Sequence, residues 1–411
     1  MFGHHGLIRP AAWPGAMVAL AVCAPLAGQS ILYVDDDAPP GGTGQSWETA
    51  YRFLQDALAA AASSGGTVEL RIAQGTYLPD HDEADPDGTK LPEDTFAMFG
   101  DVAVVGGYAG LGAADPDARD VKLYETILSG DLEGDDLPGF INYEDNSIHV
   151  VTIDEAGSAP LLDGLTFTAG HTRPDTYDDG CGVYNVDGSP TLIECRFVKN
   201  FSSSYGGGMS SEDNAEPTLI DCAFSSNRGG GFAVGCTGAI VMNCQFAGNQ
   251  SERCGVGVSI WSNNITLVDC AFTDNVALYD GSGWYSGSGG AACARNSDAT
   301  FTACLFSGNV AKRNSGAVDI DSYYSSGTGP EFTECTFIGN AAAWRGGGMY
   351  VDAYWLPPTL TGCIFTDNSA VDFGGAIANY RTSPTIDACS FVGNSTDGDG
   401  GAVYNLSLIH I

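Results

Sequence analysis

Five polar residues of types that support acid–base chemistry follow a predicted strand at residues 161–170. They are His171, Arg173, Asp175, Asp178 and Asp179. Such a cluster can combine a metal ion, which lowers the pKa of a substrate's α-proton, with a base that removes this proton. That combination is the chemistry of a polysaccharide lyase. A polar loop at a chain corner explains the same residues, and we favour this second interpretation.

A second candidate site lies in the acidic segment 83–94, which approaches the D-x-D-x-D-G pattern of a calcium loop. Its candidate ligands are Glu83, Asp85, Asp87 and Asp94. Carboxylate oxygens at alternate positions suit calcium. The pattern lacks its first aspartate and its helical flanks, and an aspartate stands where the last glutamate belongs. We therefore favour a solvated acidic loop; no cofactor is required, and calcium is the one candidate.

The charge of the chain excludes some classes of partner. Among 411 residues, 51 are acidic and 16 are Lys or Arg, which leaves a net charge of −35. Binding to phosphate groups needs Lys and Arg, so nucleic acids and anionic membrane surfaces are poor partners. The acidic residues are spread along the chain, which fits an exposed polar surface or one that recruits divalent cations.

The N-terminus predicts export. Arg9 supplies positive charge, residues 16–27 form a short apolar stretch, and small residues follow, so residues 1–28 are interpreted as a signal peptide. A lipoprotein signal acylated at Cys23 is the alternative, and Val22 argues against it. No later stretch has the roughly twenty apolar residues of a membrane helix. We expect a secreted or cell-surface protein with no transmembrane segment in the mature chain.

These residues must be positioned by a repeating structure. Cys-x-Phe-x-x-Asn recurs with a period of roughly 22 to 34 residues, which is typical of a solenoid. The eight repeats are Cys195/Phe197/Asn200, Cys222/Phe224/Asn227, Cys244/Phe246/Asn249, Cys270/Phe272/Asn275, Cys304/Phe306/Asn309, Cys335/Phe337/Asn340, Cys363/Phe365/Asn368 and Cys389/Phe391/Asn394. Glycine runs such as 206–208 and 347–348 follow the asparagines and lead into further apolar residues.

One repeat illustrates the predicted coil. Alternation with a period of two places Ile193, Cys195 and Phe197 on one face of a strand, while Leu192 falls out of phase and implies a bend just upstream. Asn200 is expected in the left-handed backbone region at the next turn, where asparagine is better tolerated than most residues. Stacked asparagines would then hydrogen-bond in a ladder.

Short strands, no helical pattern between them and repeats too short for a propeller blade predict an all-β fold, a right-handed parallel β-helix. We assign it to residues 95–405, after an N-terminal cap at residues 30–94. Residues 406–411 continue no repeat, and no polar terminal cap follows. We therefore expect that the chain is truncated there; folding of this tail over the last coil is the alternative.

The FxxN and GGA[I/V] repeats at residues 180–405 resemble those of polymorphic outer membrane proteins and, more broadly, bacterial β-helix proteins of pectate-lyase-like shape. Upstream, "YVDDDAPPGGTGQSWETAYRFLQDAL", "ILSGD" and "LLDGLTFTAG" resemble the start of many exported β-helix proteins. The resemblance implies a helix at residues 46–62 that covers the first coil. The residues agree, since Leu54, Ala57 and Leu58 share a face, Ser46 can cap the helix, and glycines 65–66 can stop it.

The cysteines separate into two groups. The eight repeat cysteines are expected to point inward as buried, reduced thiols, because parallel side chains one coil apart lie slightly too far apart for a disulfide. The others in the repeat region can pair or form a second ladder; they are Cys181, Cys236, Cys254 and Cys293. No pattern of cysteines and histidines suggests zinc.

Aromatic residues outside the repeat positions gather in the longer loops. They are Tyr279, Trp284, Tyr285, Tyr323, Tyr324, Trp344, Tyr354 and Trp355. Exposed aromatic rings can stack on sugars, but we favour simple packing over the coil.

We predict a non-catalytic, adhesin-like or structural β-helix that binds a surface polysaccharide or another cell-surface protein. The chain is expected to be monomeric unless its open C-terminal coil pairs. The alternative is a polysaccharide lyase or another carbohydrate-active enzyme on the same scaffold, because fold does not determine function. Few basic residues, and only His149 and His171 in the repeat region, argue against the enzyme. A cleft with convergent carboxylates and an Arg or Lys would favour it.

Overall fold

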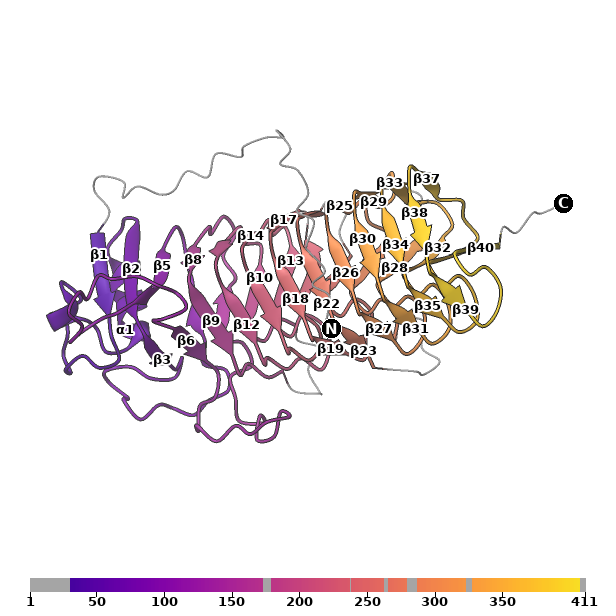
Figure 1. The fold of residues 1–411 in the computed structure, drawn as a ribbon. Coiled ribbons are helices and arrows are strands. Elements are labelled where there is room, and N and C mark those ends of the chain that lie inside the picture. The colour runs from indigo at the N-terminus through magenta and orange to yellow at the C-terminus, as the bar shows by residue number, and fades with distance from the viewer. Residues whose placement is uncertain are drawn as a thin grey trace, which may run out of the picture.

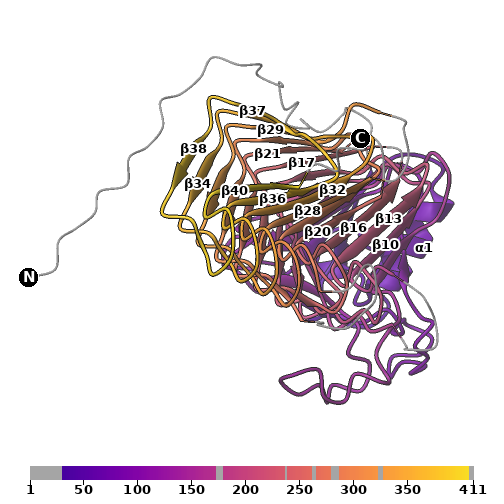
Figure 2. The same ribbon diagram turned by 90° about the vertical axis from the view of Figure 1, so that its right-hand side faces the viewer.

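The computed structural model describes residues 30–172, 179–236, 238–261, 265–278, 287–322 and 327–406. Over these residues the chain forms stacked coils whose strands pair in parallel, one coil with the next (Figure 1). Seen along the stack, each coil turns through successive sheets (Figure 2). The coils wind in the right-handed sense that connections between parallel strands adopt. This is the predicted all-β, right-handed parallel β-helix.

Four parallel sheets form the coils. Sheet 1 contains β1 (Ser30–Val34), β2 (Val68–Ala73), β5 (Ala103–Tyr108), β8 (Leu161–Asp163), β11 (Thr191–Ile193), β14 (Thr218–Ile220), β17 (Ala239–Met242), β21 (Ile265–Val268), β25 (Thr300–Thr302), β29 (Glu331–Thr333), β33 (Thr359–Thr361) and β37 (Thr385–Asp387). Sheet 2 contains β3 (Gly75–Tyr77), β6 (Thr126–Ser129), β9 (Leu165–Thr168), β12 (Arg196–Val198), β15 (Ala223–Ser225), β18 (Gln245–Ala247), β22 (Ala271–Thr273), β26 (Leu305–Ser307), β30 (Thr336–Ile338), β34 (Ile364–Thr366) and β38 (Ser390–Val392).

Sheet 3 contains β4 (Phe96–Ala97), β7 (Val151–Ile153), β10 (Val183–Val186), β13 (Met209–Asp213), β16 (Phe232–Cys236), β20 (Val258–Ile260), β24 (Ala292–Arg295), β28 (Val318–Ser322), β32 (Met349–Ala353), β36 (Ile377–Tyr380) and β40 (Val403–Leu406). Sheet 4 contains the two-residue strands β19 (Gln250–Ser251), β23 (Val276–Ala277), β27 (Val310–Ala311), β31 (Ala341–Ala342), β35 (Ser369–Ala370) and β39 (Ser395–Thr396). A typical coil passes through sheets 3, 1, 2 and 4 in that order.

The repeat strand predicted around Cys195 is two strands that belong to different sheets. β11 ends at Ile193, and β12 begins at Arg196. Glu194 between them has a φ of 50°, so the chain turns a corner there. The inward residue of β11 is therefore Leu192, which is fully buried, while Ile193 is only partly buried. The predicted orientation of these two residues was wrong, because the bend lies after them and not before them.

The corner at the asparagines also differs from the prediction. Lys199, the residue before Asn200, adopts the left-handed conformation with a φ of 55°, and the seven equivalent residues do the same. Asn200 itself has no positive φ and is fully buried. The asparagine is therefore selected for its side chain and not for its backbone conformation.

The predicted asparagine ladder is confirmed. Asn275 donates its backbone N–H to Oδ1 of Asn309 at 3.1 Å and its Nδ2 to the same oxygen at 2.9 Å. Its Nδ2 also donates to the carbonyl of Phe246, one coil earlier, at 2.8 Å. Equivalent bonds run from Asn200 to Asn394. Each buried amide thus satisfies polar groups of the neighbouring coils, as burial requires.

Phenylalanines and cysteines fill the columns beside this ladder. Successive rings from Phe197 to Phe391 stack with centroids 4.2 to 5.1 Å apart. All repeat cysteines except the partly buried Cys389 are buried, and all eight are free thiols. Glycine is needed beside them at Gly347, where a Cβ atom would lie 2.3 Å from the carbonyl oxygen of Gly375 in the next coil. The predicted inward, unpaired cysteine column is confirmed.

The N-terminal end of the stack is covered by a helix that begins later than predicted. The short 3-10 helix at Trp47–Thr49 follows Ser46, which caps it, and α1 spans Leu54–Ser63. The predicted face is confirmed, since Leu54, Ala57, Leu58 and Ala61 are buried and belong to the core of the coils. α1 lies at the first coil (Figure 1), where it protects the interior from water.

The segment assigned as an N-terminal cap also belongs to the sheets. Sheets 1 and 2 begin with β1 to β3, so the segment 30–94 contributes strands to the stack as well as the covering helix. The proposed signal peptide at residues 1–28 lies outside the described residues, as do residues 407–411. Across the described part of the chain, none of the helices has the length and apolar character needed to cross a membrane.

Candidate functional site

The outward face of sheet 3 carries a pocket of about 350 Å³, which we name the arginine–aspartate pocket. It is lined by Cys254, Ser288, Cys293, Arg295, Arg313, Asn314, Asp319, Asp321, Trp344, Arg345, Tyr350, Asp352, Tyr380 and Arg381. Four of the 16 basic residues of the chain thus meet in one place. Carboxylates and arginines converge in this pocket, which is the feature expected of the enzyme alternative.

Strand register creates the pocket floor. Arg295 of β24 pairs with Asp321 of β28, which pairs with Asp352 of β32. A second column, two residues earlier in each strand, contains Cys293, Asp319 and Tyr350. Residues between the columns, such as Ile320, point into the core and are buried. Because parallel neighbours lie about 4.8 Å apart, each floor residue contacts the next along the stack.

Arg381 closes one end of the pocket. It donates from Nε to Oδ1 of Asp352 at 2.8 Å and from Nη2 to Oδ2 at 2.5 Å. This two-bond geometry is the strong form of an arginine–carboxylate pair. The guanidinium also lies 4.8 Å from the ring centre of Tyr380. The two bonds therefore fix Arg381 and Asp352 in position.

Two further arginines come from the corners that lead into sheet 3. The guanidinium of Arg313 lies 5.2 Å from the ring centre of Trp344, and that of Arg345 lies 5.7 Å from Phe373. Stacking on aromatic rings holds an arginine without using all its hydrogen bonds. The buried Nε atom of Arg345 and the buried Oδ1 atom of Asn314 have no hydrogen-bond partner. Each therefore lacks the partner that a buried polar atom normally has.

Asp319 is the most buried acid of the pocket, with 7% of its surface exposed. Burial raises its pKa to about 7, and Asp321 adds to this shift, while Arg295 opposes it. The pKa of Tyr350 in the same column is also raised, chiefly by burial. Asp319 therefore carries a proton in part of the molecules at neutral pH. A carboxyl group that stays protonated near neutral pH can act as a general acid.

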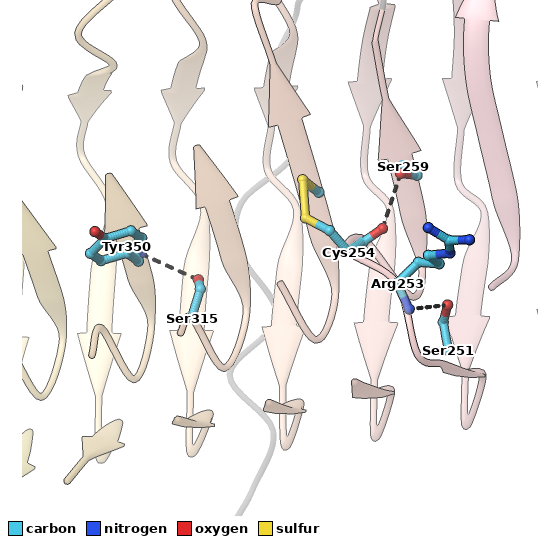
Figure 3. The surroundings of a disulfide bond; sticks show 7 residues. Ser251, Arg253, Cys254, Ser259, Ser315 and Tyr350 are labelled. Carbon is cyan, nitrogen blue, oxygen red and sulfur yellow. Dashed lines mark hydrogen bonds between the residues drawn. A yellow bond between two sulfur atoms is a disulfide. The ribbon is translucent and has the colours of Figure 1, made fainter. Parts of the chain in front are cut away.

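A disulfide forms one wall of the pocket. Cys254 and Cys293 are bonded, with Cα atoms 5.8 Å apart (Figure 3). The carbonyl of Cys254 accepts a hydrogen bond from Ser259 at 3.0 Å. The prediction that cysteines outside the repeat column can pair is thus confirmed for this pair. Cys181 and Cys236 are free and buried, and burial raises the pKa of Cys236 to about 11.

The predicted lyase cluster can be followed only in part, because Arg173, Asp175 and Asp178 lie outside the described residues. His171 is buried at a corner, with its ring 4.9 Å from Phe201 and 6.2 Å from Tyr143. Asp179 accepts the backbone N–H of Tyr205 at 2.9 Å, and burial raises its pKa to about 6. Neither residue lines the arginine–aspartate pocket.

The predicted calcium ligands are not gathered around one point. In the described part of the chain, no group of three close metal-binding atoms includes Glu83, Asp85, Asp87 or Asp94. Asp94 instead accepts a hydrogen bond from Thr89. Asp80, which precedes this segment, is buried, and its carboxylate lies 3.7 Å from Nζ of Lys90 within the segment.

Of the loop aromatic residues considered as candidates for stacking on sugars, Trp344, Tyr354 and Trp355 are described, and 43% to 57% of their surface is exposed. Trp344 lines the arginine–aspartate pocket. Sequence reasoning missed the pocket acids, although "AVDID" and "MYVDA" after the glycine runs place aspartates at the alternate, outward positions of two successive predicted strands.

Comparisons with known proteins agree with this architecture. Residues 155–337 match the family described as "Right handed beta helix region", and residues 388–406 match the "Chlamydia polymorphic membrane protein (Chlamydia_PMP) repeat". No match was found among curated proteins.

Two solved structures are similar at low identity. Pectate lyase Pel9A matches with 12% identity and a TM-score of 0.46, over 92% of this chain and 83% of that chain. The Dettilon tailspike protein matches with 10% identity and a TM-score of 0.32, over 88% and 68%. From the family matches and the parallel sheets, the chain is a right-handed parallel β-helix protein whose repeats resemble those of the polymorphic membrane proteins.

Proposed function

We propose that the chain is a cell-surface or secreted β-helix that binds an anionic carbohydrate at the arginine–aspartate pocket. The observation that carries this proposal is the convergence of four arginines in one pocket of a chain whose net charge is −35. Four arginines minus three aspartates leave one positive charge, and partial protonation of Asp319 increases it. The repeat match to polymorphic membrane proteins supports the surface location.

The many acidic residues of the chain repel an anionic ligand, whereas the pocket arginines attract it. The distance of each charge from the ligand decides which effect dominates. Charges in solution are screened beyond a Debye length of about 10 Å at 0.1 M salt. The pocket arginines contact a bound ligand directly, whereas most acidic residues lie on other coils. Arg345 and Trp344 together offer a carboxylate partner and an apolar ring surface, which suits a sugar that carries a carboxyl group.

Binding can be measured by calorimetry with an oligosaccharide of uronic acids and a neutral oligosaccharide of equal length. We expect the acidic ligand to bind at least tenfold more tightly. Arg345→Gln should remove most of this preference, while Arg196→Gln on sheet 2 should leave it unchanged, because Arg196 pairs with Glu125 far from the pocket lining. Equal affinity for both ligands would refute the proposal.

Cleavage of the bound glycan is the second candidate function, favoured by the raised pKa of Asp319 in a pocket that holds two further carboxylates. A protonated Asp319 could donate a proton to a leaving oxygen while an ionised carboxylate acts as base or nucleophile. New reducing ends without unsaturated products would indicate hydrolysis, and unsaturated ends would indicate a lyase. Loss of turnover in Asp319→Asn with retained binding would establish the enzyme. If the protein binds acidic polysaccharides but releases no product from any of those tested, the binding function stands and the enzymatic function is refuted.

A further inference from the structure

A group of carboxylates lies away from the arginine–aspartate pocket, in the insertion between β6 and β7. Asp131, Asp135 and Asp136, which we name the acidic cluster, each contribute one oxygen, and these oxygens lie within 4.8 Å of one another. Three negative charges at this spacing repel each other. The fold holds them together nevertheless, so the contacts of each residue need an explanation.

Hydrogen bonds within the loop explain the position of Asp131. Its Oδ1 accepts the backbone N–H of Gly134 at 2.8 Å and that of Asp135 at 3.2 Å. Aspartate commonly closes turns in this way, and such a turn requires no ion. These bonds do not account for Asp136.

Asp136 and Asn146 leave two buried oxygens unsatisfied. Asn146 is 1% exposed, and its Nδ2 reaches into the cluster to donate to Oδ2 of Asp136 at 2.9 Å. The same nitrogen donates to the carbonyl of Ala169 at 2.8 Å, which fixes the amide. Oδ1 of Asn146 and Oδ1 of Asp136 are both buried and have no hydrogen-bond partner. Each such oxygen destabilises the fold unless a donor or a cation meets it.

No side-chain cation of the described residues balances the cluster. None of the ion pairs between described residues includes Asp131, Asp135 or Asp136. Lys90 approaches the insertion, but its Nζ donates to the carbonyl of Leu132 and pairs with Asp80.

We propose that the acidic cluster binds a calcium ion, with Asp131, Asp135 and Asp136 as carboxylate ligands and the Asn146 oxygen beside them. The donors are all oxygen, which excludes the nitrogen and sulfur sets preferred by zinc. Calcium accepts six to eight oxygens in irregular geometry, including carbonyls and waters, whereas magnesium requires near-octahedral geometry. Rings of the same insertion pack on the coils, with Phe140 5.4 Å from Phe201, so the ion would fasten the insertion to the stack.

Calorimetry on the full chain, freed of divalent ions with a chelator, tests the site. We expect calcium chloride to bind at least tenfold more weakly to Asp136→Asn, which keeps the size of the side chain but removes its charge. The matched control is Asp85→Asn in the segment 83–94, which should bind calcium like the unaltered chain. No binding up to millimolar calcium, or unchanged binding in Asp136→Asn, would overturn the proposal.

A second measurement needs no variant and therefore does not depend on folding of the altered chain. Calcium should slow hydrogen exchange of residues 130–147 in the unaltered protein, while the other acidic group, at residues 35–37, should exchange as before. Unchanged exchange at residues 130–147 contradicts the site. An equal effect of magnesium at the same concentration would contradict its assignment to calcium.

Discussion

The inner and outer faces of the coils behave differently. Towards the core, the coils repeat the same residue types, as in the phenylalanine column from Phe197 to Phe391. Towards solvent, one column changes from Ser259 to Cys293, Asp319 and Tyr350 over four successive coils. Inner residues contact their own equivalents one coil away, so they must fit one another. Outer residues are free to vary, and the variation creates the arginine–aspartate pocket.

This comparison implies that core substitutions cost stability and that pocket substitutions cost binding. The largest loss is expected for Phe306→Ala, because its ring is fully buried between those of Phe272 and Phe337. We expect the free energy of unfolding in urea to fall by about 3–5 kcal/mol. Thr273→Ala on the outer face of sheet 2 is the control and should change it by less than about 0.5 kcal/mol. Similar losses in both variants would remove the distinction between the faces.

The next largest effect is a pH dependence that belongs to the pocket. The pKa of Asp319 is raised from 3.8 to about 7 in the folded chain, so the folded state holds the proton more tightly. Its stabilising contribution is complete below about pH 4 and is lost as the pH rises through 7. Asp319→Asn should remove this pH dependence, which amounts to a change of up to about 4 kcal/mol in the free energy of unfolding. Chemical denaturation of each variant at pH 4.5 and pH 8 measures this pH dependence, and Asp269→Asn at an exposed position is the control. An equal change with pH in both variants would contradict the raised pKa of Asp319.

A smaller effect is expected in the cysteine column. Cys304→Ser should lower the free energy of unfolding by about 1–3 kcal/mol, because the smaller hydroxyl must reach carbonyl oxygens that lie 3.5 and 3.6 Å from the sulfur. Thiol labelling provides an independent measurement. The native protein should react slowly, and the protein denatured without reductant should expose the ten free thiols of the described residues. Low labelling after denaturation would mean that the column is paired.

The smallest effect is expected for Arg196→Gln on the outer face of sheet 2. The side chains of Arg196 and Glu125 are 49% and 41% exposed, and ion pairs of this kind contribute less than about 1 kcal/mol. Chemical denaturation should detect little change. A loss larger than that of Cys304→Ser would show that outer contacts stabilise the stack as much as inner ones.

The repeat fold could be predicted from the sequence because its core is periodic. Phenylalanine, cysteine and asparagine contact copies of themselves, so the stacking leaves a regular pattern along the chain. The covering helix was also recognisable, since its buried face includes Leu54, Ala57 and Leu58. The corners were not identified, although most left-handed residues before the cysteines and asparagines are Gly, Asp or Asn, with exceptions such as Glu194 and Lys199.

The candidate site depended on the tertiary structure. Arg295, Asp321 and Asp352 stand at equivalent positions of successive repeats, but the residue type changes from coil to coil, so no repeated residue marks the site in the sequence. Register brings Arg295 opposite Asp321 and Asp352, and Arg381 is positioned by its two bonds to Asp352. The disulfide between Cys254 and Cys293 likewise joins residues that no spacing rule would pair. The sequence alone determined what lies inside the coils, where each residue meets its own kind; the fold decided what meets on their surface, where neighbours come from other repeats.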